Sequence, residues 1–310
     1  MLCRRVAPAD GEESEQPATA AGLESWSEEM EKIIAAALSP RILSGDKDKN
    51  LASAYEGLLA AKKQGVELAV FSEWFLTHCT DERSYRVAEP VPEGPAVRQV
   101  IEFARELSMT VAMGIEELDV DRGVVYNTHF LAGPEGYIGK HRKTHLMAGE
   151  FKAHRPGGRL DVFDVGKCKV GINICHENMY GENSRILALK GMEVLISPFG
   201  CGGSSRPVRK EDWLNDFHMA CWRARCFDNG VFMIVSGGNG GESKTFRTYA
   251  CIIDPWADVI AAIEPQGNDP DVNLVVAELD PERFVSRRTD ADYPLKKRRP
   301  ELYGPIVEPY

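Results

Sequence analysis

The segment VGINICHENMYGENSRILALKGMEVLISP, residues 170–198, decides the fold class. The run from Lys169 to Ile174 predicts a strand that leads directly into Cys175. Asn183 to Lys190 predicts the next helix, and Val194 to Ser197 predicts a second strand. This strand–helix–strand order is typical of an α/β protein, and it places a nucleophilic side chain at the carboxyl end of a strand.

The same alternation of strands and helices continues on both sides of this segment. The spacing of apolar residues predicts helices over residues 50–64, 95–107 and 212–226, and strands over residues 33–38, 68–71, 110–114, 124–131, 137–142, 231–235, 249–254 and 274–278. No repeat or long linker interrupts the pattern, so we expect one α/β domain over residues 28–280. Residues 1–27 have few large apolar side chains and predict a flexible extension. Residues 281–310 predict an irregular C-terminal arm.

Composition and charge exclude several function classes. Of the 310 residues 43% are hydrophobic and 27% charged, which is typical of a globular protein. The net charge of −10 repels phosphate backbones and anionic lipid, so we expect no nucleic-acid partner and no membrane partner. No apolar run approaches the roughly 20 residues that cross a bilayer.

The cysteines and the N-terminus give further expectations. The eight cysteines form no Cys-x-x-Cys pair and no His/Cys spacing of the zinc type, so neither a disulfide framework nor a metal site is predicted. The first residues contain no apolar signal region, which makes the cytoplasm the expected location. The basic cluster at residues 296–299 predicts a solvated tail or a subunit contact rather than a localisation signal.

Three side chains at the ends of predicted strands are candidates for chemistry. They are Glu73, Lys143 and Cys175. Ligand crevices of α/β sheets lie at such strand ends. Taken singly, each has an ordinary structural explanation, since a glutamate or lysine at a strand end is commonly solvated and a cysteine commonly fills a core.

Taken together, the three residues lie in blocks that resemble a known family. The blocks are AVFSEWFLT around Glu73, GKHRKTHL around Lys143, and the segment around Cys175 quoted above. In order and spacing they resemble the signature blocks of the nitrilase superfamily of carbon-nitrogen hydrolases. The resemblance extends from residue 31 to residue 303 and includes VYNTHFLAGPEGYIGK, RARCFDNGVFMIVSGGNG and RRPELY.

The resemblance implies a mechanism that needs no metal and no cofactor. Cys175 would be the nucleophile, and Glu73 the base that carries its proton. Lys143 would stabilise the negative charge that develops on the substrate oxygen. Glu150, which precedes a Pro-Gly turn as in many members of the superfamily, would orient Lys143 and the substrate.

The residues after the nucleophile bear on the substrate. Members that act on N-carbamoyl amino acids or α-keto acid amides often place an arginine three or four residues after the cysteine, where this chain has Asn178 and Met179. A substrate carboxylate near the scissile bond is therefore disfavoured, unless an arginine such as Arg206 substitutes. His176 is expected to shape the pocket through its backbone. It occurs at this position in some amidases, whereas the following Glu-Asn pair is typical of nitrilases.

We therefore expect a thiol hydrolase that acts on a small linear amide or N-carbamoyl compound. Two alternatives stay open, namely a nitrilase that converts a nitrile to an acid and ammonia, and an inactive family member that acts as a binding scaffold. The resemblance also implies a four-layer α-β-β-α sandwich. It implies a homodimer or a larger even-numbered assembly, with the arm at residues 281–310 in the subunit contact.

Overall fold

The computed structural model describes residues 30–78, 83–200, 217–240, 250–263 and 274–308. Within these ranges the chain forms two six-stranded sheets and one two-stranded ribbon. The first sheet consists, in spatial order, of β14 (Leu274–Leu279), β1 (Ile33–Leu38), β3 (Leu68–Val70), β4 (Thr110–Asp119), β5 (Val124–Gly133) and β6 (Gly136–Arg142). The second consists of β13 (Val259–Ile263), β12 (Ala250–Ile253), β10 (Phe232–Gly237), β9 (Val194–Phe199), β8 (Lys169–Ile172) and β7 (Val162–Asp164). The ribbon pairs β2 (Arg41–Ile42) with β11 (Asn239–Gly240).

Both large sheets are mixed, with a parallel centre and antiparallel edges. Strands β1, β3 and β4 are parallel neighbours in the first sheet, and β8, β9 and β10 are parallel neighbours in the second. The carboxyl ends of parallel strands lie at the same edge of a sheet, where ligand crevices form. The segments that follow β3 and β8 therefore leave their sheets at such edges.

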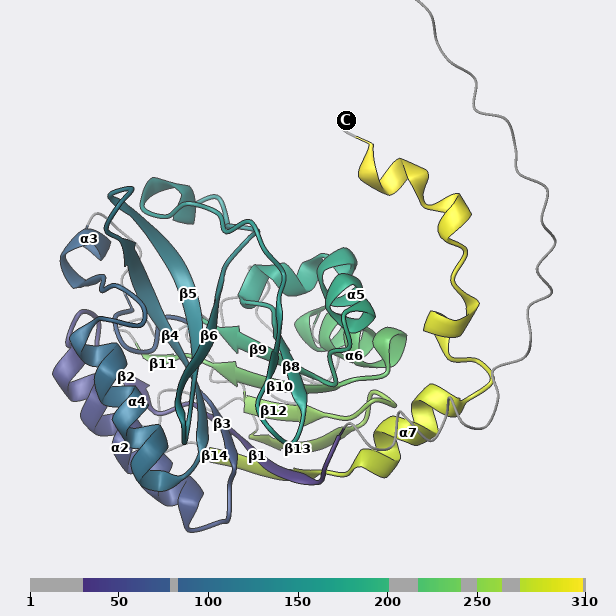
Figure 1. The fold of residues 1–310 in the computed structure, drawn as a ribbon, viewed down its shortest axis with the longest axis horizontal. Coiled ribbons are helices and arrows are strands. Elements are labelled where there is room, and N and C mark those ends of the chain that lie inside the picture. Colours follow the sequence, from purple (N-terminus) through teal and green to yellow (C-terminus); the bar gives the residue numbers. More distant parts are fainter. Residues whose placement is uncertain (1–29, 79–82, 201–216, 241–249, 264–273, 309–310) are drawn as a thin grey trace, which may run out of the picture.

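Helices cover the outer faces of both sheets (Figure 1). Helices α2 (Lys47–Lys62) and α4 (Pro95–Leu107) lie on the first sheet, and α5 (Gly181–Leu189) and α6 (Phe217–Asn229) lie on the second. A short helix, α3 (Ser84–Val87), precedes α4. The two sheets face each other between these helix layers, so the chain forms the expected four-layer α-β-β-α sandwich.

Strand β1 shows how alternating side chains build the two hydrophobic layers. Ala36 and Leu38 pack in the cluster beneath α2 and α4, whereas Ala35 and Ala37 pack in the cluster between the sheets. Successive side chains of a strand point to opposite faces, so a strand buried on both sides needs apolar residues at every position. This explains the continuous apolar run from Ile33 to Leu38.

Most predicted elements agree with the structure, and the differences lie at their ends. Strand β1 and helix α4 have the predicted bounds, whereas β4 continues five residues beyond the predicted end at Gly114. The predicted helix over residues 212–226 is described only from Phe217 and continues to Asn229. Residues 1–27, expected to be a flexible extension, lie outside the described residues.

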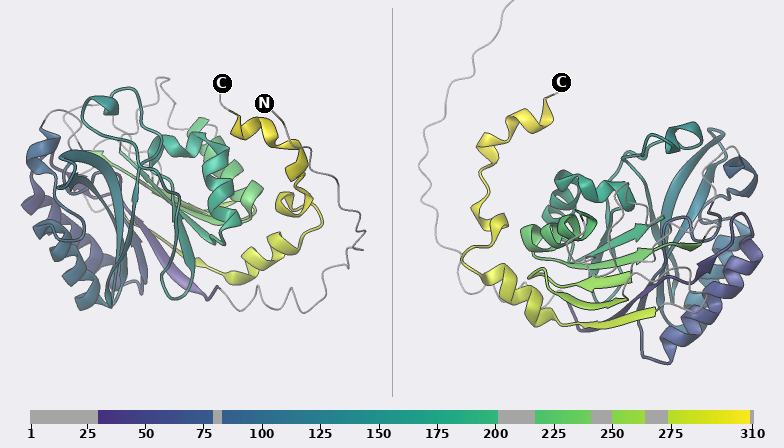
Figure 2. Two further views of the ribbon diagram at one scale, coloured as in Figure 1. Left: turned by 45° about the horizontal axis from the view of Figure 1, so that its top comes forward. Right: turned by 180° about the vertical axis from the view of Figure 1, so that it is seen from behind.

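The C-terminal arm differs from its prediction, because its first nine residues form helix α7 (Pro281–Thr289) instead of irregular chain. Asp280 caps the helix by accepting a hydrogen bond from the backbone N–H of Glu282, and Pro281 occupies the first helical position, which proline favours. Short 3₁₀ turns follow from Pro294 to Val307. Figure 2 shows α7 beyond the end of β14, with these turns outside the two sheets.

Candidate active site

Glu73 lies in a tight turn directly after β3. The next residue, Trp74, has a positive φ of 52°, and Gly114 of β4 packs against the turn. A Cβ atom on Gly114 would lie 2.5 Å from the backbone nitrogen of Trp74 and 2.6 Å from the carbonyl oxygen of Ser72. Glycine is therefore required at this position for the neighbouring strand to approach the turn that carries Glu73.

Lys143 lies directly after β6, and its backbone is held from two sides. Its N–H donates to the carbonyl oxygen of Asn127 at 2.8 Å, and its carbonyl oxygen accepts from the N–H of Gly157 at 2.7 Å. A Cβ atom on Gly157 would lie 2.1 Å from the carbonyl oxygen of Arg142. The Pro156-Gly157 turn thus packs against the lysine backbone as only glycine permits.

The Lys143 ammonium lies between two carboxylates in the protein interior. Nζ donates to Oε1 of Glu73 at 2.8 Å and to Oε1 and Oε2 of Glu150 at 2.9 and 2.8 Å. The side chains of Lys143 and Glu73 are each 1% exposed. A buried cation of this kind is stable only when it is paired and hydrogen-bonded, as it is here.

A fourth side chain, Asn127 of β5, joins the two carboxylates. Its Nδ2 donates to Oε1 of Glu73 at 2.7 Å and to Oε1 of Glu150 at 3.0 Å. Asn127 lies within one of the blocks that resemble the family, but no role was predicted for it. The available signal was an amide in a strand that is buried on both faces, where a polar group needs partners.

Burial and charge shift the pKa values within this cluster. Burial raises the pKa of Glu73, and the negative charge of Glu150 raises it further, against the opposing effect of Lys143. Burial acts to lower the pKa of Lys143, but the charges of Glu73, Cys175 and Glu150 outweigh it and raise the pKa. The lysine is therefore a permanent cation, and Glu73 is a carboxyl group suited to taking and returning a proton.

Cys175 lies in the turn that follows β8, at the first position of the 3₁₀ helix η2 (Cys175–Met179). Its φ is +51°, a left-handed conformation that is strained for a residue with a side chain. The thiol is almost buried, with 7% of the residue exposed. A charge on Cys175 is among those that raise the pKa of Lys143, so the sulfur lies within electrostatic reach of the ammonium.

The three predicted substrate-binding residues occupy different environments in the η2 turn. His176 is half-buried, and its ring lies edge-on to Tyr180 with centroids 5.5 Å apart. Asn178 is buried, and its Nδ2 donates to the carbonyl oxygen of Cys175 at 3.0 Å and to the Ser197 hydroxyl at 2.9 Å. The amide group of Asn178 therefore stabilises the turn that carries Cys175.

Met179 lies at the end of the same turn and is half-buried. Its sulfur is 4.0 Å from the thiol of Cys221 on α6. The segment that follows β9 after residue 200 falls outside the described residues, and so does Arg206. The expectation that Arg206 could contact a substrate carboxylate therefore lies outside the described residues.

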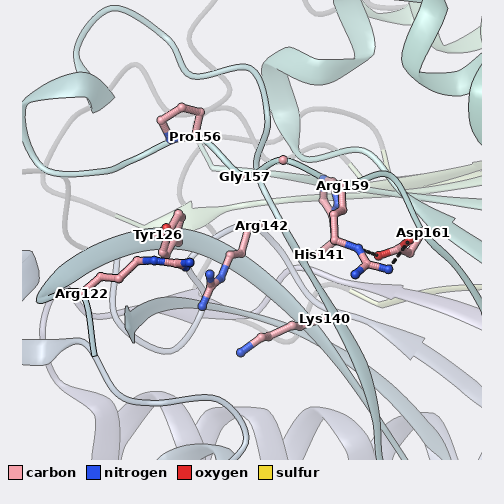
Figure 3. Close-up of a pocket in the computed structure, with 10 residues that line it drawn as sticks. Arg122, Tyr126, Lys140, His141, Arg142, Pro156, Gly157, Arg159 and Asp161 are labelled. Carbon is pink, nitrogen blue, oxygen red and sulfur yellow. Dashed lines mark hydrogen bonds and ion pairs between the residues drawn. The ribbon is translucent and has the colours of Figure 1, made fainter. Parts of the chain in front are cut away.

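A cavity of about 320 Å³ lies among residues of β6 and of the segment 156–161, and neither Lys143 nor the two carboxylates are among the residues that line it (Figure 3). It is lined by Arg142, Gly157 and several basic side chains that are already paired. Arg142 donates to Glu117, and Arg159 pairs with Asp161. This cavity is consequently distinct from the centre formed by the carboxylates, the ammonium and the thiol.

In the part of the chain that the structure describes, no group of three or more His, Cys, Asp or Glu residues has a metal-binding arrangement. Among the same residues, no helix has the length and apolarity required to cross a membrane.

Comparison with known proteins agrees with this geometry. The family model described as carbon-nitrogen hydrolase matches residues 34–289. A nitrilase of Pyrococcus abyssi is 30% identical over 280 residues, covering 88% of this chain and 99% of the relative. An omega-amidase of Bos taurus is 26% identical over 84% of this chain and 93% of its own length. An (R)-stereoselective amidase of a Pseudomonas species is 31% identical over 78% of this chain and 83% of the relative.

Solved structures show the same fold. A carbon-nitrogen hydrolase of Helicobacter pylori superposes with a TM-score of 0.79 at 19% identity, over 90% of this chain and 99% of the other. A nitrilase-superfamily protein of Saccharomyces cerevisiae gives a TM-score of 0.75 at 24% identity, over 86% and 97%. The chain therefore belongs to the carbon-nitrogen hydrolase family of the nitrilase superfamily, and it is a carbon-nitrogen hydrolase.

Proposed function

We propose that this protein is a thiol hydrolase that cleaves the carbon-nitrogen bond of a small linear amide or N-carbamoyl compound through a thioester on Cys175. The observation that carries the proposal is the buried Lys143 ammonium, which contacts the Glu73 and Glu150 carboxylates within 2.9 Å and is within electrostatic reach of the thiol. Such a centre supplies a nucleophile, a base and a fixed positive charge.

In the first half of the reaction, the Cys175 sulfur attacks the carbonyl carbon of the amide and its proton passes to Glu73. The carbonyl oxygen gains a negative charge, which the Lys143 ammonium and the backbone N–H of His176 stabilise. When the tetrahedral intermediate collapses, the carbon-nitrogen bond breaks. Glu73 returns the proton to the leaving nitrogen, which departs as ammonia or an amine.

In the second half, water hydrolyses the thioester. Glu73 takes a proton from the water as its oxygen bonds to the acyl carbon, and Lys143 again stabilises the oxyanion. The carbon-sulfur bond then breaks, the acid departs and the proton returns to the sulfur of Cys175. Glu150 keeps the ammonium in place through both halves, because its two oxygens both accept from Nζ.

We propose a substrate that is uncharged near the scissile bond. Asn178 and Met179 occupy the positions where an arginine would face a substrate carboxylate, and neither side chain carries a charge. A carboxylate beside this turn would lose its hydration without gaining a charged partner, because the Lys143 ammonium is already paired with Glu73 and Glu150.

A nitrile is the second candidate substrate. The observation in its favour is the Pyrococcus abyssi relative, which bears the name nitrilase. Attack of the thiol on a nitrile carbon gives a thioimidate, and addition of water followed by loss of ammonia converts it to the same thioester. The two candidates therefore share one centre and differ only in the substrate they accept.

Ammonia release from four small compounds tests the proposal. We expect turnover of propionamide or ethylurea, slower or no turnover of propionitrile, and none of oxamate, whose carboxylate is bonded directly to the amide carbon. Replacing Cys175 with Ala is expected to abolish all turnover, whereas replacing the exposed Lys297 with Ala leaves it unchanged. Turnover of propionitrile alone favours the nitrilase. Full activity of Cys175→Ala contradicts the thiol mechanism for either substrate.

A further inference from the structure

Glu177 is a fully buried carboxylate two residues after the nucleophile, and its hydrogen bonds extend to two backbone N–H groups and to the side chains of His141 and Thr144. Oε2 accepts from the N–H of Ile174 at 2.6 Å. Oε1 accepts from the N–H of Thr144 at 2.8 Å. Nε2 of His141 lies 2.9 Å from Oε2 and 3.1 Å from Oε1. In the sequence, Glu177 was noted only as part of the Glu-Asn pair that follows His176, without a role of its own.

The residues that Glu177 contacts flank the two reacting groups along the chain. Ile174 and Glu177 lie on either side of Cys175 along the chain, and His141 and Thr144 lie on either side of Lys143. One carboxylate therefore connects the turn that carries the thiol, in the second sheet, to the turn that carries the ammonium, in the first sheet. The link is made through residues that flank Cys175 and Lys143 and not through the thiol or the ammonium.

From this arrangement we infer that Glu177 is a positioning residue, which sets the place of the Cys175 thiol relative to the Lys143 ammonium. The inference rests on the proposed function, because it assigns Glu177 a role in that reaction. Loss of about 1 Å of alignment between reacting groups costs on the order of 100-fold in rate. A rigid link between the two turns therefore has a direct consequence for catalysis.

The charge of Glu177 is essential to the link, because every partner is a donor. Burial acts to raise the pKa of Glu177, but attraction to His141 and the hydrogen bonds from His141 and Thr144 outweigh burial and lower it. A glutamine has the same shape but carries a donor NH₂ in place of one oxygen. Its NH₂ would have to face the N–H of either Ile174 or Thr144, so one of the two turns would lose its anchor.

The test compares Glu177→Gln with a matched control, Glu193→Gln. Glu193 is also buried, and it accepts from the N–H of Lys169 at 2.7 Å, at the opposite end of β8 and β9 from Cys175. The main readout is the rate at which iodoacetamide alkylates Cys175 as a function of pH, located by peptide mass spectrometry. Propionamide hydrolysis and thermal unfolding are measured on the same samples.

For Glu177→Gln we expect alkylation of Cys175 at pH 7 to slow at least about 10-fold, with its pH midpoint shifted upward, because the ammonium that favours the thiolate is displaced. We expect kcat for propionamide to fall at least about 100-fold with little change in KM. For Glu193→Gln, alkylation and kcat should stay within about 3-fold of the wild type, whatever the loss of thermal stability.

Equal effects of the two variants on alkylation and kcat would overturn the inference, since burial alone would then explain them. If Glu177→Gln does not fold, Thr144→Val removes the hydroxyl that also donates to Oε1 of Glu177, keeps the backbone N–H, and is expected to lower kcat about 10-fold. An unchanged kcat in that variant would also overturn the inference. A wild-type enzyme whose Cys175 is unreactive and dispensable for turnover contradicts the proposed function instead.

Discussion

Burial and neighbouring charges set the protonation behaviour of the individual residues in this site. Lys143 contributes one positive charge between the carboxylates of Glu73 and Glu150, so the three groups together carry an excess negative charge when all are ionised. A low-dielectric interior disfavours that excess, and the pKa of Glu73 is raised as a result. Glu73 thereby becomes a base whose protonation can change during the reaction.

The pH dependence of activity follows from this shift. A base must be deprotonated to act, so kcat/KM is expected to fall as the pH drops through a value above the ordinary glutamate pKa of about 4.3. Replacing Glu150 with Gln removes a negative charge that raises the pKa of Glu73, so the acid limb should move to lower pH. Profiles of kcat/KM against pH for the two proteins check this. An acid limb that moves upward contradicts the assignment of Glu73.

At the scale of elements, the turns after the strands carry the chemistry, and the sequence predicted the strands better than the turns. Glu73, Lys143 and Cys175 were predicted at strand ends because the strands expected from the sequence end shortly before them. The roles of Asn127 and Glu177 were not predicted, because their side-chain contacts with other elements join residues that lie 23 to 54 positions apart, and local spacing carries no record of such contacts.

Other misses have similar physical causes. Strands β7 and β13 were not predicted, because β7 is only three residues long and β13 alternates half-buried with exposed positions. Helix α7 was not predicted, because its residues are mostly polar and only Phe284 and Arg287 are buried. Tertiary contacts rather than a continuous apolar face stabilise these elements.

We expect that no side chain can be added at Gly114 of β4 without moving the turn after β3. In Gly114→Ala the added Cβ would collide with the backbone of Ser72 and Trp74, so the turn that carries Glu73 must move. We expect a loss of about 1–3 kcal/mol in the free energy of unfolding and at least about a 10-fold lower kcat. Gly158→Ala is the control, because no atom lies within 4 Å of its added Cβ. Equal kinetics for both variants and the wild type would contradict this account of the turn.

At the scale of the whole molecule, a buried cation helps to hold the C-terminal helix against the helix layer of the second sheet. The guanidinium of Arg287 lies 4.0 Å from the ring centroid of Phe227, 5.1 Å from that of Trp256 and 5.4 Å from that of Tyr293. Its Nη2 donates to the carbonyl oxygen of Phe227 at 3.2 Å. These contacts connect α7 to α6 and to the loop after β12.

Replacing Arg287 with Ala is expected to lower the free energy of unfolding by about 2–4 kcal/mol, because the ring contacts and the filled volume are lost together. Urea denaturation measures the change. The matched control is Arg299→Ala, which removes an exposed arginine paired only at the surface and should change stability little. If Arg287→Ala loses no more stability than the control, the contacts of Arg287 do not stabilise the packing of α7.

The turns after α7 are expected to contact a second copy of the chain. Leu302, Ile306 and Val307 are 62%, 60% and 85% exposed in the single chain, an unusual placement for large apolar side chains in one short segment. Light scattering coupled to size-exclusion chromatography should give a dimer or a larger even-numbered assembly, and a chain truncated after Tyr293 should give a smaller one. A monomeric full-length protein would contradict this expectation.

The claim that Cys175, Lys143 and Glu73 form one reacting centre is tested most directly by trapping the acyl intermediate. The protein is mixed with propionamide, quenched in acid within the first turnover, digested and analysed by mass spectrometry. The account predicts a propionyl group on Cys175 alone, more of it in Glu73→Gln if thioester hydrolysis slows more than its formation, and none in Cys175→Ala. Turnover that proceeds with the acyl group on another cysteine, or without Cys175, would contradict it.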